Sequence, residues 1–180
     1  MMASVVMIVI VAAGFYAIPK VQQRVDDSAK LFFNPNVTGD DIESVNISTY
    51  AIYSNFRVSK AALEDYPVFG YGLGSYERIY HSYIKRVMPS NHLTRTIVLN
   101  DKDANSLLLR LGAETGIVGL LLITWFVAYF RVRANDLNKL TAEEMEYCII
   151  NSGAFVVILI RLLRMGHYTT PGFALVFAPY

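Results

Sequence analysis

Four polar side chains lie at helical spacing where a polar segment of the chain gives way to an apolar one. Asp103, Ser106, Arg110 and Glu114 follow one another at intervals of three, four and four residues, which places them on one face of a helix. Arginine and glutamate in the first turns of a membrane-spanning helix are costly unless they pair or face water. Two interpretations follow: a simple Arg110–Glu114 pair at the interface, or a water-filled cavity lined by this polar face and open toward residues 20–105.

The stretch YPVFGYGLGSY, residues 66–76, carries three glycines at alternate positions. Gly70-x-Gly72-x-Gly74 lacks the spacing of a dinucleotide fingerprint or a P-loop, so a nucleotide site is disfavoured. The glycines instead predict a turn that uses positive φ angles and close backbone approach. Gly112 and Gly116 are four residues apart, a pattern typical of close helix packing.

Apolar residues make up 54% of the 180 residues and are gathered into blocks long enough to predict membrane helices. No basic residue precedes the first block, which favours a retained span over a cleaved signal peptide. We therefore expect an all-α polytopic membrane protein with a large, partly helical extracytoplasmic loop. The predicted segments are a span at 1–19, the loop at 20–105, spans at 106–130 and 147–164 joined by a cytoplasmic connection at 131–146, and an outer turn with the start of a further span at 165–180. Because that last apolar run stops after a few residues, we expect the chain to be part of a longer protein.

Charge excludes one class of partner. The formal net charge is +1 and the polar region at 20–105 is balanced, so no nucleic-acid footprint is expected. Cys148 is the single cysteine, which leaves neither a disulfide framework nor a cysteine metal cluster. We expect no metal and no cofactor. The basic residues flanking the spans give no clear orientation.

Two helices are predicted within the polar region, at residues 48–66 and 76–88, joined by the glycine turn. In the first, one stripe holds Ile52, Phe56, Leu63 and Tyr66 and another holds Tyr53, Arg57, Lys60 and Glu64. In the second, Ser75 is the expected cap, and the apolar side holds Tyr76, Tyr80, Tyr83, Ile84 and Val87. Their tyrosines favour a place at the membrane surface.

The segments FRVSKAALEDYPVFGYGLGSY and DANSLLLRLGAETGIVGLLL, in this order, resemble the O-antigen ligase and O-antigen polymerase family of bacterial membrane glycosyltransferases. That family shows an arginine, a helix, a proline and a glycine-rich turn. After a variable loop come His-Asn, a leucine-rich segment and Glu-x-Gly-Ile-x-Gly at the start of a membrane helix. The resemblance covers about residues 56–122.

The resemblance implies glycan transfer from an undecaprenyl-pyrophosphate carrier to a lipid A-core or growing glycan acceptor. It also implies that the large loop lies outside the bacterial inner membrane, facing the periplasm or exterior. Arg57 matches the family's arginine, and a guanidinium can stabilise the departing diphosphate bidentately. The implied catalytic residues are Arg57, Asn105 and Asp103, and the implied substrate contacts are Arg57, Arg110, Ser106, Glu114, His81 and His92.

One departure from the family affects the mechanism. Asn105 stands where the ligases carry histidine, and Ser106 where they carry asparagine. Because asparagine does not take up a proton at neutral pH, this favours a polymerase-like member or a base elsewhere, for which His81, His92 and Asp103 are the candidates. The alternatives are a non-enzymatic membrane module that binds a partner or lipid headgroups through its Tyr76–Tyr83 face, and an inactive fragment.

Overall fold

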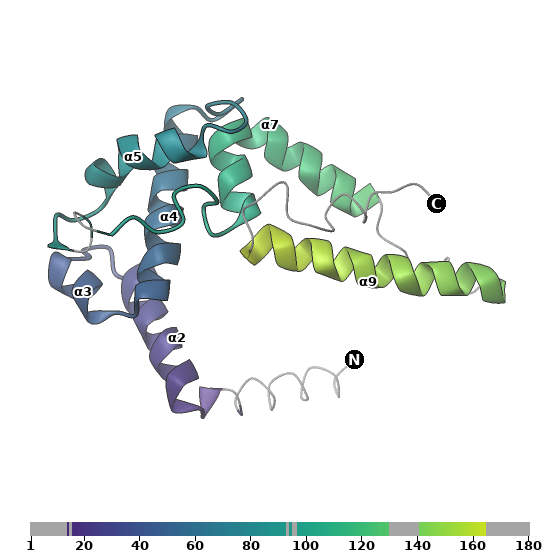
Figure 1. Cartoon of the computed structure of the whole chain (residues 1–180), viewed down its shortest axis with the longest axis horizontal. Helices are drawn as coiled ribbons and strands as arrows, with labels where there is room; N and C mark the ends of the chain where they lie inside the picture. The colour runs from purple at the N-terminus through teal and green to yellow at the C-terminus, as the bar shows by residue number, and fades with distance from the viewer. Residues whose placement is uncertain (1–13, 15, 93, 95–96, 130–140, 165–180) are drawn as a thin grey trace.

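The computed structural model describes residues 14, 16–92, 94, 97–129 and 141–164. Every regular element in these ranges is a helix, which confirms the all-α prediction for the described part of the chain (Figure 1). The helices are α2 (Pro19–Phe32), α3 (Gly39–Ser44), α4 (Ile47–Asp65), α5 (Tyr76–Val87), α7 (Leu107–Tyr129) and α9 (Ala142–Arg164). In Figure 1, α4 lies between α5 above it and α2 below it, and α7 and α9 extend from this group toward the right of the view.

Among the described residues, two helices are long and apolar enough to cross a membrane. They are Leu107–Tyr129, with a mean hydropathy of 1.8, and Met145–Arg164, with 1.7. Large apolar side chains on them are exposed, among them Leu121, Trp125 and Ile149, which suits contact with lipid better than contact with water. The spans predicted at 106–130 and 147–164 thus match observed helices. The span predicted at 1–19 lies almost wholly outside the described residues, as do the turn at 165–180 and most of the connection at 131–146.

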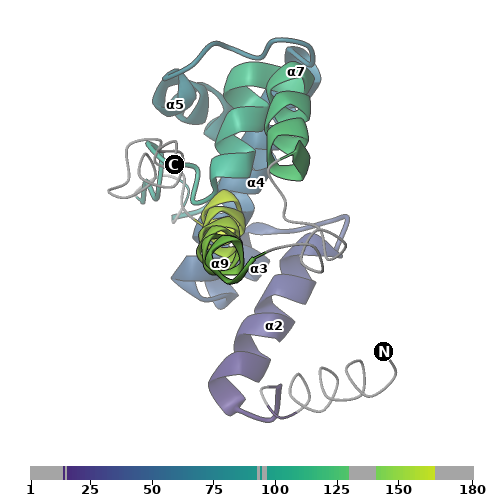
Figure 2. The ribbon, with the colours of Figure 1, turned by 90° about the vertical axis from the view of Figure 1, so that its right-hand side faces the viewer.

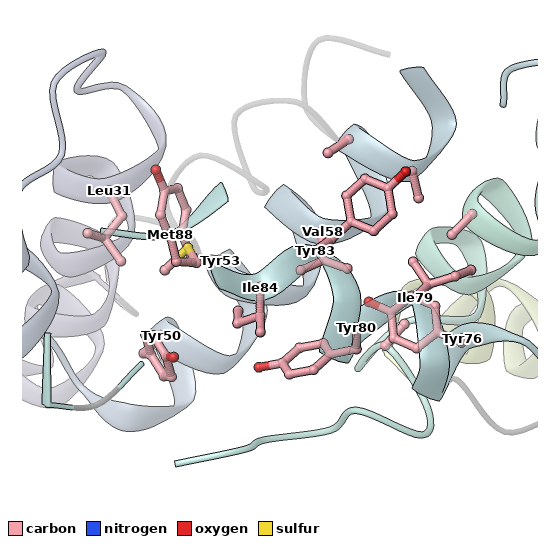
Figure 3. Packing of buried hydrophobic residues seen from close by; sticks show 14 of the residues in the cluster. Leu31, Tyr50, Tyr53, Val58, Tyr76, Ile79, Tyr80, Tyr83, Ile84 and Met88 are labelled. Carbon is pink, nitrogen blue, oxygen red and sulfur yellow. The ribbon is translucent and has the colours of Figure 1, made fainter. Parts of the chain in front are cut away.

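The core of the polar region forms around α4, which packs against α2, α5 and α7. Tyr50 and Val58 of α4 meet Ile79 and Tyr80 of α5 there, and each of these side chains is at most 1% exposed (Figure 3). The side predicted to be apolar in α5 is therefore confirmed by Tyr76, Tyr80, Tyr83 and Ile84, which are buried.

The stripe of bulky residues predicted for α4 is wrong. Ile52 and Tyr66 are 37% and 54% exposed, whereas Tyr53 from the other stripe is buried. The reason is that neighbours surround α4 on several sides, and small residues such as Ala51, Ser54 and Ala62 let them approach closely. Periodicity of large side chains alone does not reveal a helix packed in this way.

Helix α7 is bent sharply at Gly116, which has φ 63° and ψ −158°. The break leaves backbone groups without partners inside the helix, and residues 67–72 supply them. Ile117 donates its backbone N–H to the Pro67 carbonyl at 2.8 Å, and Val118 donates to that of Val68 at 3.2 Å. In the other direction, Tyr71 donates to the Ala113 carbonyl at 3.1 Å and Gly72 to that of Glu114 at 2.7 Å. The glycine turn is thus docked, backbone to backbone, into the break.

The two arms of α7, residues 107–115 and 117–129, fold toward each other (Figure 2). Leu111 of the first arm and Ile123 and Val127 of the second pack against the same cluster, which includes Leu162 of α9. A Cβ added at Gly112 would lie 3.6 Å from Leu120 Cδ1 of the second arm. The predicted close packing at Gly112 is therefore made between the two arms of one bent helix, whereas at Gly116 it is made with the backbone of Pro67 and Val68.

Candidate functional site

Arg57 lines a pocket of about 450 Å³ between α2, α4 and α5. The charged residues around it are Arg57, Lys60, Glu64 and Arg86, three cations to one anion. Its apolar lining includes Leu31, Phe32 and Phe56. This combination of a polar, positively charged wall with an apolar one suits an anionic amphiphile.

The half-buried guanidinium of Arg57 is oriented by its own helix. Its Nη1 donates to the Tyr53 hydroxyl at 2.9 Å, and its Cζ lies 5.7 Å from the centre of the Tyr53 ring. Because Tyr53 is itself only 3% exposed, it fixes the direction of the arginine. None of the ion pairs among the described residues involves Arg57. Its remaining N–H donors are therefore not committed to a carboxylate.

Arg86 is held in the same pocket by contacts with α4 and α5. Its Nη1 lies 3.0 Å from Asp65 Oδ2, and its Cζ lies 4.5 Å from the centre of the Tyr83 ring. Hydrogen bonds from Arg86 and Tyr83 hold the pKa of Asp65 below its ordinary value, while the Asp65 contact raises the pKa of Arg86. Burial, followed by the bond to Asp65, raises the pKa of Tyr83. Arg86 therefore stays charged at the pocket wall.

Acid should remove the contribution of Asp65 to stability. Its folded-state pKa lies below the ordinary 3.8, so the ionised form stabilises the fold at pH values above about 4 and that stabilisation is lost as the pH falls through the folded-state pKa. Asp65→Asn should make the loss of thermal stability below about pH 4 shallower. Melting curves followed by circular dichroism in detergent measure this. A profile identical to that of the wild type in this window would contradict it.

Glu114 is fully buried and caps helix α5. Its Oε2 accepts the backbone N–H of Gly74, its Oε1 accepts that of Tyr76, and Arg110 Nε donates to Oε1, each at 3.0 Å. The predicted Arg110–Glu114 pair is confirmed. The alternative interpretation, in which Glu114 lines an open, water-filled cavity, is wrong, because its carboxylate is buried and accepts hydrogen bonds from Gly74, Tyr76 and Arg110. This geometry is that of a structural cap.

The predicted cap at Ser75 is also wrong. Its hydroxyl donates to the Gly72 carbonyl at 2.6 Å instead of accepting from the first turn of α5. Ser75 therefore closes the glycine turn. The N-terminus of α5 is capped instead by Glu114, which lies 38 residues after Tyr76 in the sequence. A carboxylate at a helix N-terminus satisfies the free N–H groups and interacts favourably with the helix dipole.

Asn105 and Ser106 face the end of α9. Asn105 lines a cavity of about 160 Å³ together with Ser48 and Arg164, and Arg164 Nη1 donates to Asn105 Oδ1 at 3.4 Å. Ser106 is buried, and its hydroxyl donates to the Leu162 carbonyl at 2.9 Å. Asp103 Oδ1 accepts the backbone N–H of Asn105 at 3.0 Å. In the sequence, Arg164 is simply the last residue of the span predicted at 147–164, and its basic side chain is the one signal of a role in this cavity.

The predicted site residues are not gathered at one place. The pocket of Arg57 and the cavity of Asn105 share no lining residue. Neither His81 nor His92 lines either of them: His81 Nε2 lies 3.1 Å from Asp101 Oδ2, and the backbone N–H of His92 donates to Glu43. Lys60 and Arg86, which do join Arg57, were not predicted as site residues.

The loop before α7 has unusual backbone geometry. Asn100, Ala104 and Asn105 adopt positive φ angles of 56°, 56° and 58°. Non-glycine residues rarely take this conformation, and such positions cluster at functional sites.

Comparison with protein-family models, with curated proteins and with solved structures finds no match for this chain.

Proposed function

We propose that this chain is part of a bacterial surface-polysaccharide ligase or polymerase that binds the diphosphate of an undecaprenyl-linked glycan at Arg57. The observation that carries the proposal is the half-buried Arg57 guanidinium, oriented by Tyr53 and free of a carboxylate partner among the described residues, in a pocket with Lys60 and Arg86. Guanidinium groups bind diphosphate oxygens through paired, charge-assisted hydrogen bonds. The resemblance at residues 56–122 supplies the reaction class.

The chemistry assigns a role to each charge. An acceptor hydroxyl attacks the anomeric carbon, the bond from that carbon to the diphosphate oxygen breaks, and the electron pair leaves with the diphosphate. Cations near the leaving group stabilise that negative charge. The hydroxyl proton needs an acceptor, and Glu64 is the carboxylate among the residues that line this pocket. The acceptor is a lipid A-core or a growing glycan.

The proposed location is the bacterial inner membrane with residues 20–105 on the periplasmic or outer side. Support comes from two apolar helices, α7 and α9, joined to a helical unit whose charged residues are balanced. A lipid-linked donor presents its diphosphate at the membrane surface, next to such a unit.

Arg57→Ala should abolish transfer. Losing one stabilising donor group typically slows a reaction about 10²–10³-fold, and Arg57→Lys should recover little because it lacks the planar fork. The assay is the surface glycan made in the native host, with the membrane level of the protein measured in parallel. Arg78→Ala is the matched control, since Arg78 is an exposed arginine on α5 outside the pocket lining. Normal glycan in the Arg57→Ala strain would reject the role.

The surface through which the non-enzymatic alternative would bind a partner or lipid headgroups is buried. Tyr76 and Tyr80 are 0% and 1% exposed and Tyr83 is 6% exposed, so the Tyr76–Tyr83 face is core and is not available to a partner or to lipid headgroups. These tyrosines were assigned to a membrane surface from composition, and packing against α4 is the physical reason that they lie inside.

A further inference from the structure

A second group of chemically active side chains lies outside the Arg57 pocket. Glu77 and His81 are one turn apart on the exposed side of α5, and Asp101 reaches them from the loop that precedes α7. One ligand atom from each lies within 4.8 Å of the other two, and His81 Nε2 is 3.1 Å from Asp101 Oδ2. The three residues are thus gathered around one point.

We propose that Glu77, His81 and Asp101 bind a divalent transition metal ion, with Zn²⁺ as the best fit. Zinc takes imidazole nitrogen and carboxylate oxygen at about 2.0–2.2 Å, so two ligand atoms of a tetrahedral ion lie about 3.5 Å apart. Rotation of the exposed side chains closes the remaining distance, which is about 1 Å at most. Imidazole disfavours Mg²⁺ and Ca²⁺, which prefer oxygen ligands. Three protein ligands leave a coordination position for water.

The site is supported from both sides. Glu77 and His81 share a helix, and the His81 ring packs edge-on against the buried Tyr80 with centroids 5.9 Å apart. On the other side, Asn55 Nδ2 donates to the Leu99 carbonyl at 3.0 Å, and Ala104 donates its N–H to the Asn100 carbonyl at 2.9 Å. These bonds fix the turn that carries Asp101. Little ordering is then needed when the ion binds.

A bound ion would join α5 to the loop that carries Asp103 and Asn105. Because this loop leads directly into α7, metal binding should raise the melting temperature of the chain and slow amide exchange across residues 99–105. Affinity should fall on acidification, since only the neutral imidazole coordinates the metal. None of these effects depends on the role proposed for Arg57.

The test is calorimetric titration of ZnCl₂ into the full chain, purified in detergent without a histidine tag and treated with EDTA. We expect saturable binding of one ion per chain and a zinc-dependent rise in melting temperature. His81→Ala and Asp101→Asn should each weaken binding at least about tenfold, because losing even a group that only supports a ligand costs 10–100-fold. Replacement by Co²⁺ should give a visible absorption band that both variants lose.

The matched control is His92→Ala, which removes an exposed histidine outside the cluster and should bind zinc as the wild type does. The His81 side chain is 53% exposed and Asp101→Asn keeps its shape, so both variants should melt like the wild type in EDTA. Absence of saturable zinc binding in the wild type would overturn the proposal. Equal affinity in the wild type and in His81→Ala would do so as well, since the ion would then be held elsewhere.

Discussion

Glu114→Ala is expected to lower the free energy of unfolding by about 3–5 kcal/mol, the usual cost of removing one partner from a buried ion pair. Arg110, whose side chain is 12% exposed, would keep a charge without its carboxylate. The N–H groups of Gly74 and Tyr76 would also lose their acceptor, which leaves the start of α5 uncapped. The measurement is thermal or denaturant unfolding of the full chain in detergent, followed by circular dichroism.

Glu64→Ala provides the matched control. Glu64 Oε1 lies 3.8 Å from Lys60 Nζ at the same i,i+4 spacing, but both side chains are about 60% exposed. The loss expected there is below about 1 kcal/mol. The double variant Arg110→Ala/Glu114→Ala should be more stable than Glu114→Ala alone, because it no longer buries the Arg110 charge without the Glu114 carboxylate. If Glu114→Ala melted with the wild type, the capping role would be disproved.

Gly116→Ala is expected to destabilise the chain by about 3 kcal/mol or more, through two effects that add. Gly116 has a φ of +63°, which an alanine adopts only at a cost, and the added Cβ would lie 2.5 Å from the Val68 carbonyl oxygen. Relieving that overlap requires residues 67–68 to move away from the break. The hydrogen bonds from Ile117 and Val118 would then be lost.

Gly74→Ala separates the two effects. Gly74 has a φ of +80° but no atom lies within 4 Å of its added Cβ, so this variant should show only the conformational cost of about 1–2 kcal/mol. Gly70→Ala should resemble Gly116→Ala, since its Cβ would lie 2.5 Å from the backbone of Glu114. Equal unfolding free energies for Gly116→Ala and Gly74→Ala would show that the glycine turn is not docked into α7.

The sequence allowed the local features of the fold to be predicted, because these depend on neighbours along the chain. The buried side of α5, the two described apolar helices and the Arg110–Glu114 pair all follow from periodicity or from i,i+4 spacing. The buried sides of α4 could not be predicted in this way, since three other helices decide them. The Glu114 cap of α5 joins residues 38 positions apart, and no local pattern indicates such a partner.

The residues of the candidate sites also divide into those that the sequence indicated and those that only the tertiary structure brings together. Arg57 was found by resemblance, whereas Arg86 enters its pocket only because α5 lies against α4 and Asp65 holds the arginine there. The i,i+4 spacing of Glu77 and His81 was visible in the sequence, but Asp101, twenty residues after His81, was not a predictable third ligand. His81 and His92 were proposed as bases because they share one loop, yet neither lines the pocket of Arg57.

The bend in α7 has a consequence for the order of synthesis. The carbonyl groups that accept from Ile117 and Val118 belong to Pro67 and Val68, which leave the ribosome about fifty residues earlier. The N–H groups of Tyr71 and Gly72 that bind the first arm are likewise already made. When the second arm emerges, every backbone partner that the bend uses is in place. The turn of the chain at Gly116 can therefore form as soon as Val118 has emerged from the ribosome, before the rest of the second arm has done so.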